Sequence, residues 1–252
     1  MQSNLPDIVC SKKCKQYKIP KQCLQKYQDE NTQILEIGVD EVGRGPLFGR
    51  VYTAAVILPK DDSFNHYKMK DSKRFTSTTE LEVVSEYIKK NALAWDVTYE
   101  SESVIDDINI LQATQKSMHK SILNVRKKMI DTLNEKHNPS DFSFKILVDG
   151  NYFKPLTTFN KTRGIIEEIQ HTCVLKGDNT YSSIAAASII AKVERDQYIK
   201  QLCADNPELI ERYSLDTNKG YGTKPHIEGI KKYGITSWHR KSFGICKKID
   251  LE

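Results

Sequence analysis

The chain has 252 residues, of which 38% are hydrophobic and 28% charged, with a net charge of +5 and a mean hydropathy of -0.55. This length can bury a substantial core in one large domain, or in a domain with an appendage. The composition excludes a membrane-spanning protein, because the longest apolar run, residues 184–191, is far shorter than the ~20 residues that cross a bilayer. Residues 1–20 are polar and lysine-rich, unlike a signal peptide. We expect a soluble intracellular protein of the cytoplasm, or of a host nucleus or cytoplasm if the source is viral or eukaryotic.

The cysteines are scattered and form no Cys-x-x-Cys pair with a matching partner. They are Cys10, Cys14, Cys23, Cys173, Cys203 and Cys246. Reduced thiols are the favoured interpretation. A zinc site at the first three is the weaker alternative, because no histidine lies nearby to complete four ligands.

Residues 1–33 are polar, contain six lysines and show little periodicity, which predicts a basic, flexible N-terminal extension. The β-branched, apolar run at 34–40 predicts the first strand, and it ends at the adjacent carboxylates Asp40 and Glu41, before a Gly-Arg-Gly turn at 43–45. Neighbouring side chains on a strand point to opposite faces, so both acids serve one site only if the backbone bends there. The glycines allow that bend and let a ligand approach the main chain.

Further apolar runs predict strands at 51–58, 93–99, 144–149 and 172–176. Helices are predicted after the Ser77 and Glu80 capping pair, and over 111–133, 182–203 and 225–233. The short connection makes the first two strands antiparallel. A helix precedes 144–149, so this strand can run parallel to the first and bring Asp149 to the same sheet end as Asp40. This order predicts an α/β fold with a mixed five-stranded sheet flanked by helices.

Four acids, Asp40, Glu41, Asp149 and Asp178, lie at predicted strand ends. Clustered carboxylates repel one another unless cations neutralise them, and magnesium accepts carboxylates while keeping water and substrate phosphate as ligands. Two such ions about 3.5–4 Å apart can activate water and stabilise the leaving oxygen in phosphodiester hydrolysis. The alternative is that these acids are turn and capping residues. P-loop and serine-hydrolase motifs are absent from the sequence, which excludes those chemistries.

Seven segments extend over most of the chain, from about Leu35 to Phe243. They are Gly38-Val39-Asp40-Glu41-Val42-Gly43-Arg44-Gly45-Pro46-Leu47, Asp71-Ser72-Lys73, Val148-Asp149-Gly150, Lys176-Gly177-Asp178, Ala186-Ala187-Ser188-Ile189-Ile190-Ala191-Lys192-Val193-Glu194-Arg195-Asp196, Gly220-Tyr221-Gly222-Thr223 and His239-Arg240-Lys241-Ser242-Phe243. In this order they resemble the motifs of type 2 ribonuclease H, the ribonuclease HII family. The resemblance implies a ribonuclease H-like catalytic domain over 34–205. It also implies a C-terminal basic, helical extension over 206–252 that contributes to substrate binding.

By this resemblance the catalytic, metal-binding carboxylates would be Asp40, Glu41, Asp149 and Asp178, with Asp196 an additional or substitute ligand. The family implies Mg²⁺ or Mn²⁺, two ions per site. It implies cleavage of the RNA strand of RNA/DNA hybrids, and cleavage on the 5′ side of a ribonucleotide embedded in duplex DNA, leaving a 3′-hydroxyl and a 5′-phosphate. A role in ribonucleotide excision repair and DNA replication follows from that activity.

The resemblance also assigns substrate contacts. Gly43, Arg44 and Gly45 would read the 2′-hydroxyl through the backbone, which is the group that separates RNA from DNA. Tyr221 would stack on the sugar after the ribonucleotide. Candidates for phosphate contacts are Lys73, Ser188 and Lys192. The alternatives are a core or turn tyrosine and solvated lysines, and His239 is not needed as a base.

Other features bear on partners and specificity. Residues 219–248 carry eight Lys or Arg against one acid, Glu228, a tract that attracts a polyanion or is a solvated helix face. Val42, Phe48, Arg50 and Phe75 differ from residues common in the family and bear on rate and fine specificity. We expect a monomer whose partner is nucleic acid, with no membrane and no sliding-clamp motif. The competing functions are a ribonuclease H limited to longer hybrids and a noncatalytic hybrid-binding protein.

Overall fold

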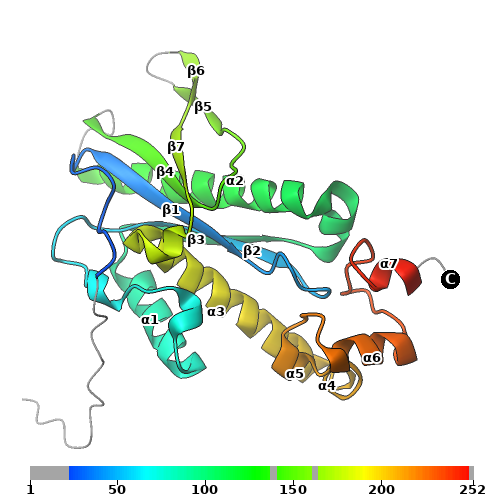
Figure 1. Cartoon of the computed structure of the whole chain (residues 1–252). Helices are drawn as coiled ribbons and strands as arrows, with labels where there is room; N and C mark the ends of the chain where they lie inside the picture. Colours follow the sequence, from blue (N-terminus) through cyan, green and yellow to red (C-terminus); the bar gives the residue numbers. More distant parts are fainter. Residues whose placement is uncertain (1–22, 137–140, 161–163, 250–252) are drawn as a thin grey trace, which may run out of the picture.

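The computed structural model describes residues 23–136, 141–160 and 164–249, and a five-stranded sheet runs through its centre (Figure 1). The sheet order is β3-β2-β1-β4-β7, with β1, β2 and β3 antiparallel and with β4 and β7 parallel to β1. The bounds are β1 Ile34–Val42, β2 Val51–Ile57, β3 Ala94–Glu100, β4 Ser143–Asp149 and β7 Gln170–Val174. The mixed sheet is confirmed, and every predicted strand end lies within two residues of the observed one.

Helices cover both faces of the sheet (Figure 1). On one face α2 (Glu102–Lys136) packs on β2 and β3, and on the other α3 (Ser182–Asp205) packs on β1 and β2, with α1 (Thr78–Asn91) against α3. The first half of α3 is buried because its alanines and serines let the helix approach the sheet closely. The structure is therefore a three-layer α/β fold.

Strand β1 separates two cores. Ile37 and Val39 belong to the core under α2, whereas Gly38 faces α3. A Cβ on Gly38 would lie 2.5 Å from the backbone nitrogen of Ile184, so a larger residue would push α3 away from the strand. Since side chains alternate along a strand, Asp40 points to the same face as Gly38.

The long helix α2 contains a break that the sequence did not predict. Asn109 adopts φ 65°, and its side-chain oxygen accepts hydrogen bonds from the backbone N–H groups of Leu111 (3.0 Å) and Gln112 (3.1 Å). These contacts cap a second helical segment, which matches the predicted helix over 111–133. The preceding segment, residues 102–108, was missed because its many acids hide the apolar periodicity.

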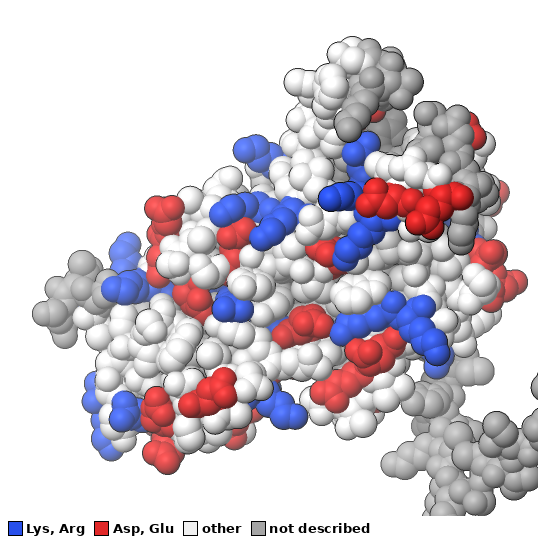
Figure 2. Space-filling view, turned by 180° about the vertical axis from the view of Figure 1, so that it is seen from behind, with Lys and Arg blue, Asp and Glu red and all other residues white. Residues whose placement is uncertain are grey.

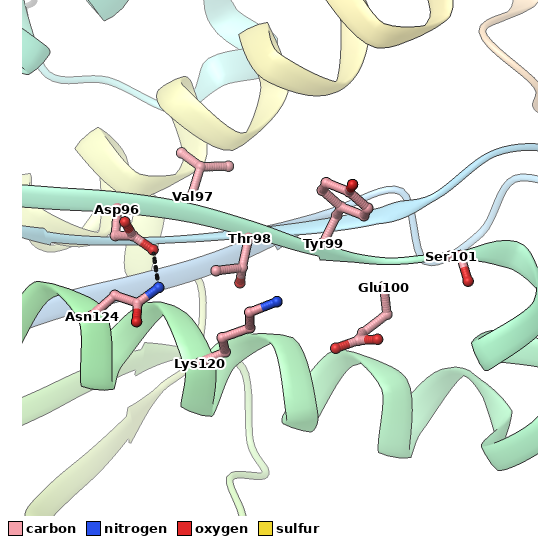
Figure 3. A pocket seen from close by; sticks show the side chains of 8 residues that line it. All are labelled: Asp96, Val97, Thr98, Tyr99, Glu100, Ser101, Lys120 and Asn124. Atoms are coloured by element: carbon pink, nitrogen blue, oxygen red, sulfur yellow. Dashed lines mark hydrogen bonds between the residues drawn. The ribbon is translucent and has the colours of Figure 1, made fainter.

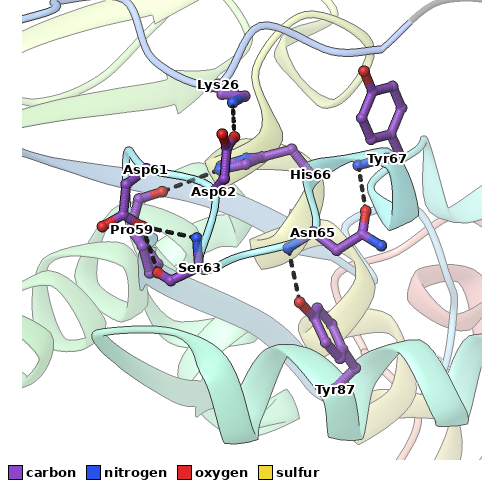
Figure 4. Close-up of polar contacts among 9 residues, drawn as sticks. All are labelled: Lys26, Pro59, Asp61, Asp62, Ser63, Asn65, His66, Tyr67 and Tyr87. Atoms are coloured by element: carbon purple, nitrogen blue, oxygen red, sulfur yellow. Dashed lines mark hydrogen bonds and ion pairs between the residues drawn. The ribbon is translucent and has the colours of Figure 1, made fainter.

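Residues 23–33 belong structurally to the main domain, although the sequence placed them in the extension. Gln25 pairs with the backbone around Tyr181, and the backbone N–H of Gln28 donates to Glu36 at 3.0 Å. Lys26 forms an ion pair with Asp62 at 2.6 Å, in a loop that Asp61, Asn65 and His66 stabilise through local hydrogen bonds (Figure 4). Residues 1–22, including Cys10 and Cys14, lie outside the described residues.

The C-terminal part gathers around the end of α3 (Figure 1). It contains α4 Glu208–Tyr213, α5 Leu215–Asn218, α6 Lys224–Tyr233 and α7 Cys246–Ile249. The sequence predicted only α6 in this region. The hairpin of β5 (Thr157–Asn160) and β6 (Ile165–Glu168) and the short 3-10 helices η1 His66–Lys68, η2 Ser72–Arg74 and η4 Gly177–Asn179 were also missed.

Two further observations concern chain chemistry. The cysteines in the described ranges, Cys23, Cys173, Cys203 and Cys246, are all free thiols. Across the same ranges, no helix combines the length and the apolar composition needed to cross a membrane.

Candidate active site

Three aspartates, from β1, β4 and η4, lie near one another at one end of the sheet. The pairing of Val39 with Val148 on the parallel strands β1 and β4 places the next residues, Asp40 and Asp149, side by side. The backbone N–H of Gly177 donates to Oδ1 of Asp149 at 2.6 Å, and this contact brings Asp178 in η4 to the same place. The structure thus assembles acids from three distant segments.

Burial and mutual repulsion raise the pKa values of Asp40, Glu41 and Asp178. The pKa of Asp40 is held well above its usual range by burial first and then by the charges of Glu41 and Asp149. Burial also raises the pKa of Glu41, although the guanidinium of Arg44, 3.3 Å from its carboxylate, opposes the rise. The pKa of Asp178 is raised by burial and by Asp71 and Asp149. A bound cation would relieve this repulsion, so the donor set fits a hard divalent ion.

The expected bend between Asp40 and Glu41 is absent. Strand β1 keeps a regular register with β2 through Val42, because Glu41 pairs with Thr53 and Val42 with Tyr52. The turn comes later, at Gly43 with φ 93°. Because adjacent side chains on a strand point to opposite faces, Glu41 does not share the face of Asp40. It nevertheless lies close enough to Asp149, at the end of the strand, for the charge of Asp149 to raise its pKa.

The acids at this end of the sheet do not form a complete set of metal ligands. Within residues 23–136, 141–160 and 164–249, no three His, Cys, Asp or Glu side chains converge closely enough to hold an ion by themselves. A divalent ion here would need water or substrate phosphate among its ligands, which is the pattern that magnesium favours.

The Gly43–Gly45 turn is held by a buried arginine from the far end of the chain. The guanidinium of Arg240 donates to the carbonyl oxygens of Gly43 (2.6 Å), Arg44 (3.0 Å), Pro46 (2.9 Å) and Gly49 (2.8 Å). Burial, and then the neighbouring Arg195, lower the pKa of Arg240 to about 9. The fixed carbonyls fix the conformation of the whole turn.

Arg195 packs behind the same turn. It is fully buried, and its guanidinium donates to the carbonyl oxygen of Lys219 at 2.9 Å. Its side chain also fills the space beside Gly43. Arg195 and Arg240 both lie in motifs visible in the sequence, but their roles were not predictable, because a buried arginine and an exposed one look alike in a basic sequence.

Tyr221 lies across from the turn. The residue is 46% exposed, and a Cβ on Gly45 would lie 3.8 Å from its Cε1 atom. The guanidinium carbon of Arg195 lies 5.9 Å from the ring centroid. The structure therefore brings together two predicted substrate contacts, the Gly-Arg-Gly turn and Tyr221.

The other predicted residues have different surroundings. The Ser188 hydroxyl is buried and hydrogen-bonds to Asp40 and, at 3.1 Å, to Ser72. Lys73 lies close enough to Asp178 for its charge to stabilise that carboxylate. Lys192 forms an ion pair with Asp196 at 2.7 Å, further along α3 than Ser188.

Sequence reasoning missed a polar group beside Asp178. The side-chain amide of Asn179 donates to Asp178 (3.1 Å) and to Asp71 (3.3 Å), and Asp71 caps η2 through the backbone N–H of Lys73. The Asp-Ser-Lys motif was the available signal, but it suggested only the lysine. Asp71 brings a fourth aspartate to the site.

A separate open hollow lies between β3 and α2 (Figure 3). It contains Asp96 and Glu100, which form ion pairs with Lys128 (2.7 Å) and Lys116 (3.2 Å), and none of the predicted site residues. Figure 2 shows acidic and basic side chains interspersed on one face of the molecule, without a continuous basic stripe. Charge alone therefore does not locate a nucleic-acid path on that face.

Comparisons with known proteins identify the family of the chain. A family model described as Ribonuclease HII matches residues 37–246. Curated proteins named Ribonuclease HII include one from Bacteroides thetaiotaomicron, 41% identical over 217 residues, which are 85% of this chain and 92% of that protein. The solved ribonuclease H2 from Pyrococcus horikoshii OT3 has a TM-score of 0.56 and 25% identity, covering 86% of this chain and 97% of that one. Bst-RNase HIII, solved in complex with Mn²⁺, has a TM-score of 0.55 and 18% identity, covering 87% and 70%.

Proposed function

The chain belongs to the ribonuclease HII family, and from that premise we propose a specific cleavage reaction and a set of residues for it. Membership makes the protein a type 2 ribonuclease H, a hydrolase that cleaves the RNA strand of RNA/DNA hybrids. We propose that it also cuts on the 5′ side of a single ribonucleotide in duplex DNA, leaving a 3′-hydroxyl and a 5′-phosphate. The observation that carries this proposal is the arginine-braced Gly43–Gly45 turn, which lies beside the acids and opposite Tyr221.

We propose that the family's divalent metal dependence is met here by two Mg²⁺ or Mn²⁺ ions. Asp40, Glu41, Asp149 and Asp178 would hold them, and the raised pKa values of Asp40, Glu41 and Asp178 support this assignment. When bound, such ions supply an activated water and charge stabilisation for the leaving oxygen. Asp196 is the weaker candidate for a ligand, because its carboxylate already pairs with Lys192.

The chain's own residues would recognise the ribonucleotide. Glycines at 43 and 45 leave the main chain open to the 2′-hydroxyl, and Arg240 keeps that main chain rigid by binding its carbonyl oxygens. Tyr221 presents a half-exposed ring on which the following sugar can stack. Lys73, beside Asp178, is the better placed phosphate contact, whereas the Ser188 hydroxyl serves mainly to orient Asp40.

Substitution at Asp149 tests the metal site. Asp149→Asn should reduce magnesium-dependent cutting of a duplex with one ribonucleotide by more than about a hundredfold, since even outer-shell partners of a metal contribute 10–100-fold. Asp131→Asn, at an exposed position on α2, is the matched control and should cut normally. Removal of the divalent metal with a chelator should stop cleavage by the wild-type protein. Near wild-type turnover by Asp149→Asn would refute the assignment, and binding without cutting by the wild type would indicate a noncatalytic protein.

Two comparisons refine the proposal. Asp178→Asn should cost more activity than Asp196→Asn, because the charge of Asp149 reaches Asp178 whereas Asp196 pairs with Lys192. Tyr221→Ala should reduce cleavage at a single ribonucleotide more than cleavage of a continuous hybrid. Equal losses on both substrates would contradict the role of Tyr221, and a wild-type protein that cuts only the continuous hybrid would support the narrower activity.

A further inference from the structure

Two buried histidines touch each other beneath Tyr221. His226 lies on α6 and His239 in the loop that follows, within the C-terminal group of helices (Figure 1). Their Nε2 atoms are 3.1 Å apart, and the two side chains are 0% and 1% exposed. The rings of Phe48 and Tyr213 pack against both histidines, and neither ring carries a charge near neutral pH. The mechanism proposed above uses neither histidine.

The hydrogen-bond partners fix the tautomer of each ring. The backbone N–H of Thr236 donates to Nδ1 of His239 at 2.9 Å, so that nitrogen carries no proton and the proton of the neutral ring is on Nε2. This Nε2–H donates to Nε2 of His226, which must therefore carry its own proton on Nδ1. The Nδ1–H group of His226 donates to the carbonyl oxygen of Tyr221 at 2.9 Å. The result is a one-way chain of donors that ends on Tyr221.

Both rings must be neutral for this chain to exist. A further proton on Nε2 of His226 would set two N–H groups against each other across 3.1 Å. A further proton on Nδ1 of His239 would face the backbone N–H of Thr236 at 2.9 Å. Burial lowers the pKa of His226, and burial together with His226 lowers that of His239 to about 3. The packing that hides the pair thus keeps it neutral over the working range of a cell.

The chain holds the backbone of Tyr221 while leaving its ring outside. The tyrosine carbonyl also accepts from the backbone N–H of Thr223 at 2.8 Å, so two donors fix its direction. The preceding Gly220 has φ 86°, and a Cβ there would lie 2.9 Å from the carbonyl oxygen of Phe48. The ring stays half-exposed opposite Gly45. A fixed backbone and a solvent-exposed ring suit a residue that must contact a sugar at one defined position.

We propose that His226 and His239 are positioning residues that set the orientation of Tyr221, and through it the preference for a single embedded ribonucleotide over a continuous hybrid. This inference rests on the substrate role proposed for Tyr221. Both histidine side chains are buried, so the pair acts only through the hydrogen bond to the backbone of Tyr221.

Matched variants at His239 test the pair by its effect on substrate preference. His239→Gln places an amide N–H near the position of Nε2–H and should keep the ratio of kcat/KM for the single ribonucleotide to kcat/KM for the hybrid within about threefold of wild type. His239→Leu, of similar size but without a donor, should lower that ratio about tenfold, which corresponds to about 1.4 kcal/mol. In a Tyr221→Ala background His239→Leu should cause no further change, because the two residues act as a unit.

The outcomes separate the two proposals. If Tyr221→Ala leaves the ratio unchanged, the role of Tyr221 fails and the pair proposal fails with it. If Tyr221→Ala lowers the ratio but His239→Leu does not, only the pair proposal is refuted. A purely structural histidine would reduce cleavage of both substrates equally, which would also refute it.

Nitrogen NMR of the wild-type protein provides a test that does not depend on a variant folding. Long-range nitrogen–proton correlations at pH 7 should show His226 as the Nδ1–H tautomer and His239 as the Nε2–H tautomer. A charged ring or the opposite tautomer at either position would overturn the proposal.

Discussion

An added methyl group should affect stability at one glycine of the turn and cleavage at another. In Gly43→Ala, the Cβ would meet the side chain of the buried Arg195, with Cδ at 2.7 Å, and would lie 3.0 Å from the carbonyl oxygen of Arg50. A non-glycine residue at the φ of 93° observed for Gly43 costs roughly 1–2 kcal/mol, and overpacking adds about 1–3 kcal/mol. We expect Gly43→Ala to lower the free energy of unfolding by about 2–5 kcal/mol.

The neighbouring glycine offers the matched control. A Cβ on Gly45 would meet only Cε1 of Tyr221, at an ordinary contact distance of 3.8 Å, and its φ is not in the left-handed region. Gly45→Ala should therefore change the free energy of unfolding by less than about 1 kcal/mol. Its methyl group would nevertheless occupy the space between the turn and the Tyr221 ring, where we place the ribose.

Urea denaturation and cleavage assays on the two variants measure both effects. Gly43→Ala should be the less stable protein, whereas Gly45→Ala should be stable but lose cleavage at a single ribonucleotide by more than about tenfold, or roughly 1.4 kcal/mol of transition-state stabilisation. Equal stability of the two variants would refute the strain argument. Wild-type cleavage by Gly45→Ala would show that close approach of this main chain is not required.

Three further predictions follow from buried titratable groups. Asp40→Asn should raise the melting temperature of the metal-free protein by a few degrees, because it removes a buried carboxylate whose pKa is raised by burial and by its acidic neighbours. A lower melting temperature than that of the wild type would contradict this prediction. Arg240→Met should lower the free energy of unfolding by about 2–4 kcal/mol, because four carbonyl oxygens lose their donor while removal of a buried charge offsets part of that cost. An unchanged midpoint in urea denaturation would refute this prediction. The pKa of His239 falls from about 6.5 in the unfolded chain to about 3 in the folded protein, so the unfolded chain binds more protons between these two pH values. The contribution of His239 to the free energy of unfolding is therefore complete above pH 6.5 and is lost as the pH drops toward 3. The dependence of unfolding free energy on pH should be shallower in His239→Gln, and an identical slope would contradict the shift.

Local sequence patterns determined the elements that build the site. The β-branched run of β1, the capping pair at Ser77 and Glu80, and the small residues of α3 each act through neighbours in the chain, so their effect is visible without a structure. The helix before β4 made a parallel pairing with β1 predictable, and this pairing placed Asp149 beside Asp40. The regular end of β1 was not predictable, because pairing of Glu41 with Thr53 overrides the freedom of the glycines that follow.

Only the tertiary structure decided how the Gly43–Gly45 turn and Tyr221 are held. Arg240 binds the carbonyl oxygen of Gly43 across 197 positions of sequence, and His239 reaches Tyr221 through His226. Hydrogen bonds between residues this far apart produce no periodic pattern in the sequence. A basic segment also has the same composition whether its arginine is solvated or buried. The sequence by itself predicted Asp40, Glu41, Asp149, Asp178 and the Gly43–Gly45 turn, because strands and turns impose local patterns. Asp71 joins these acids only in the folded structure. Folding decided which buried arginine and histidines hold them in place, because hydrogen bonds between distant residues exist only once the chain is packed.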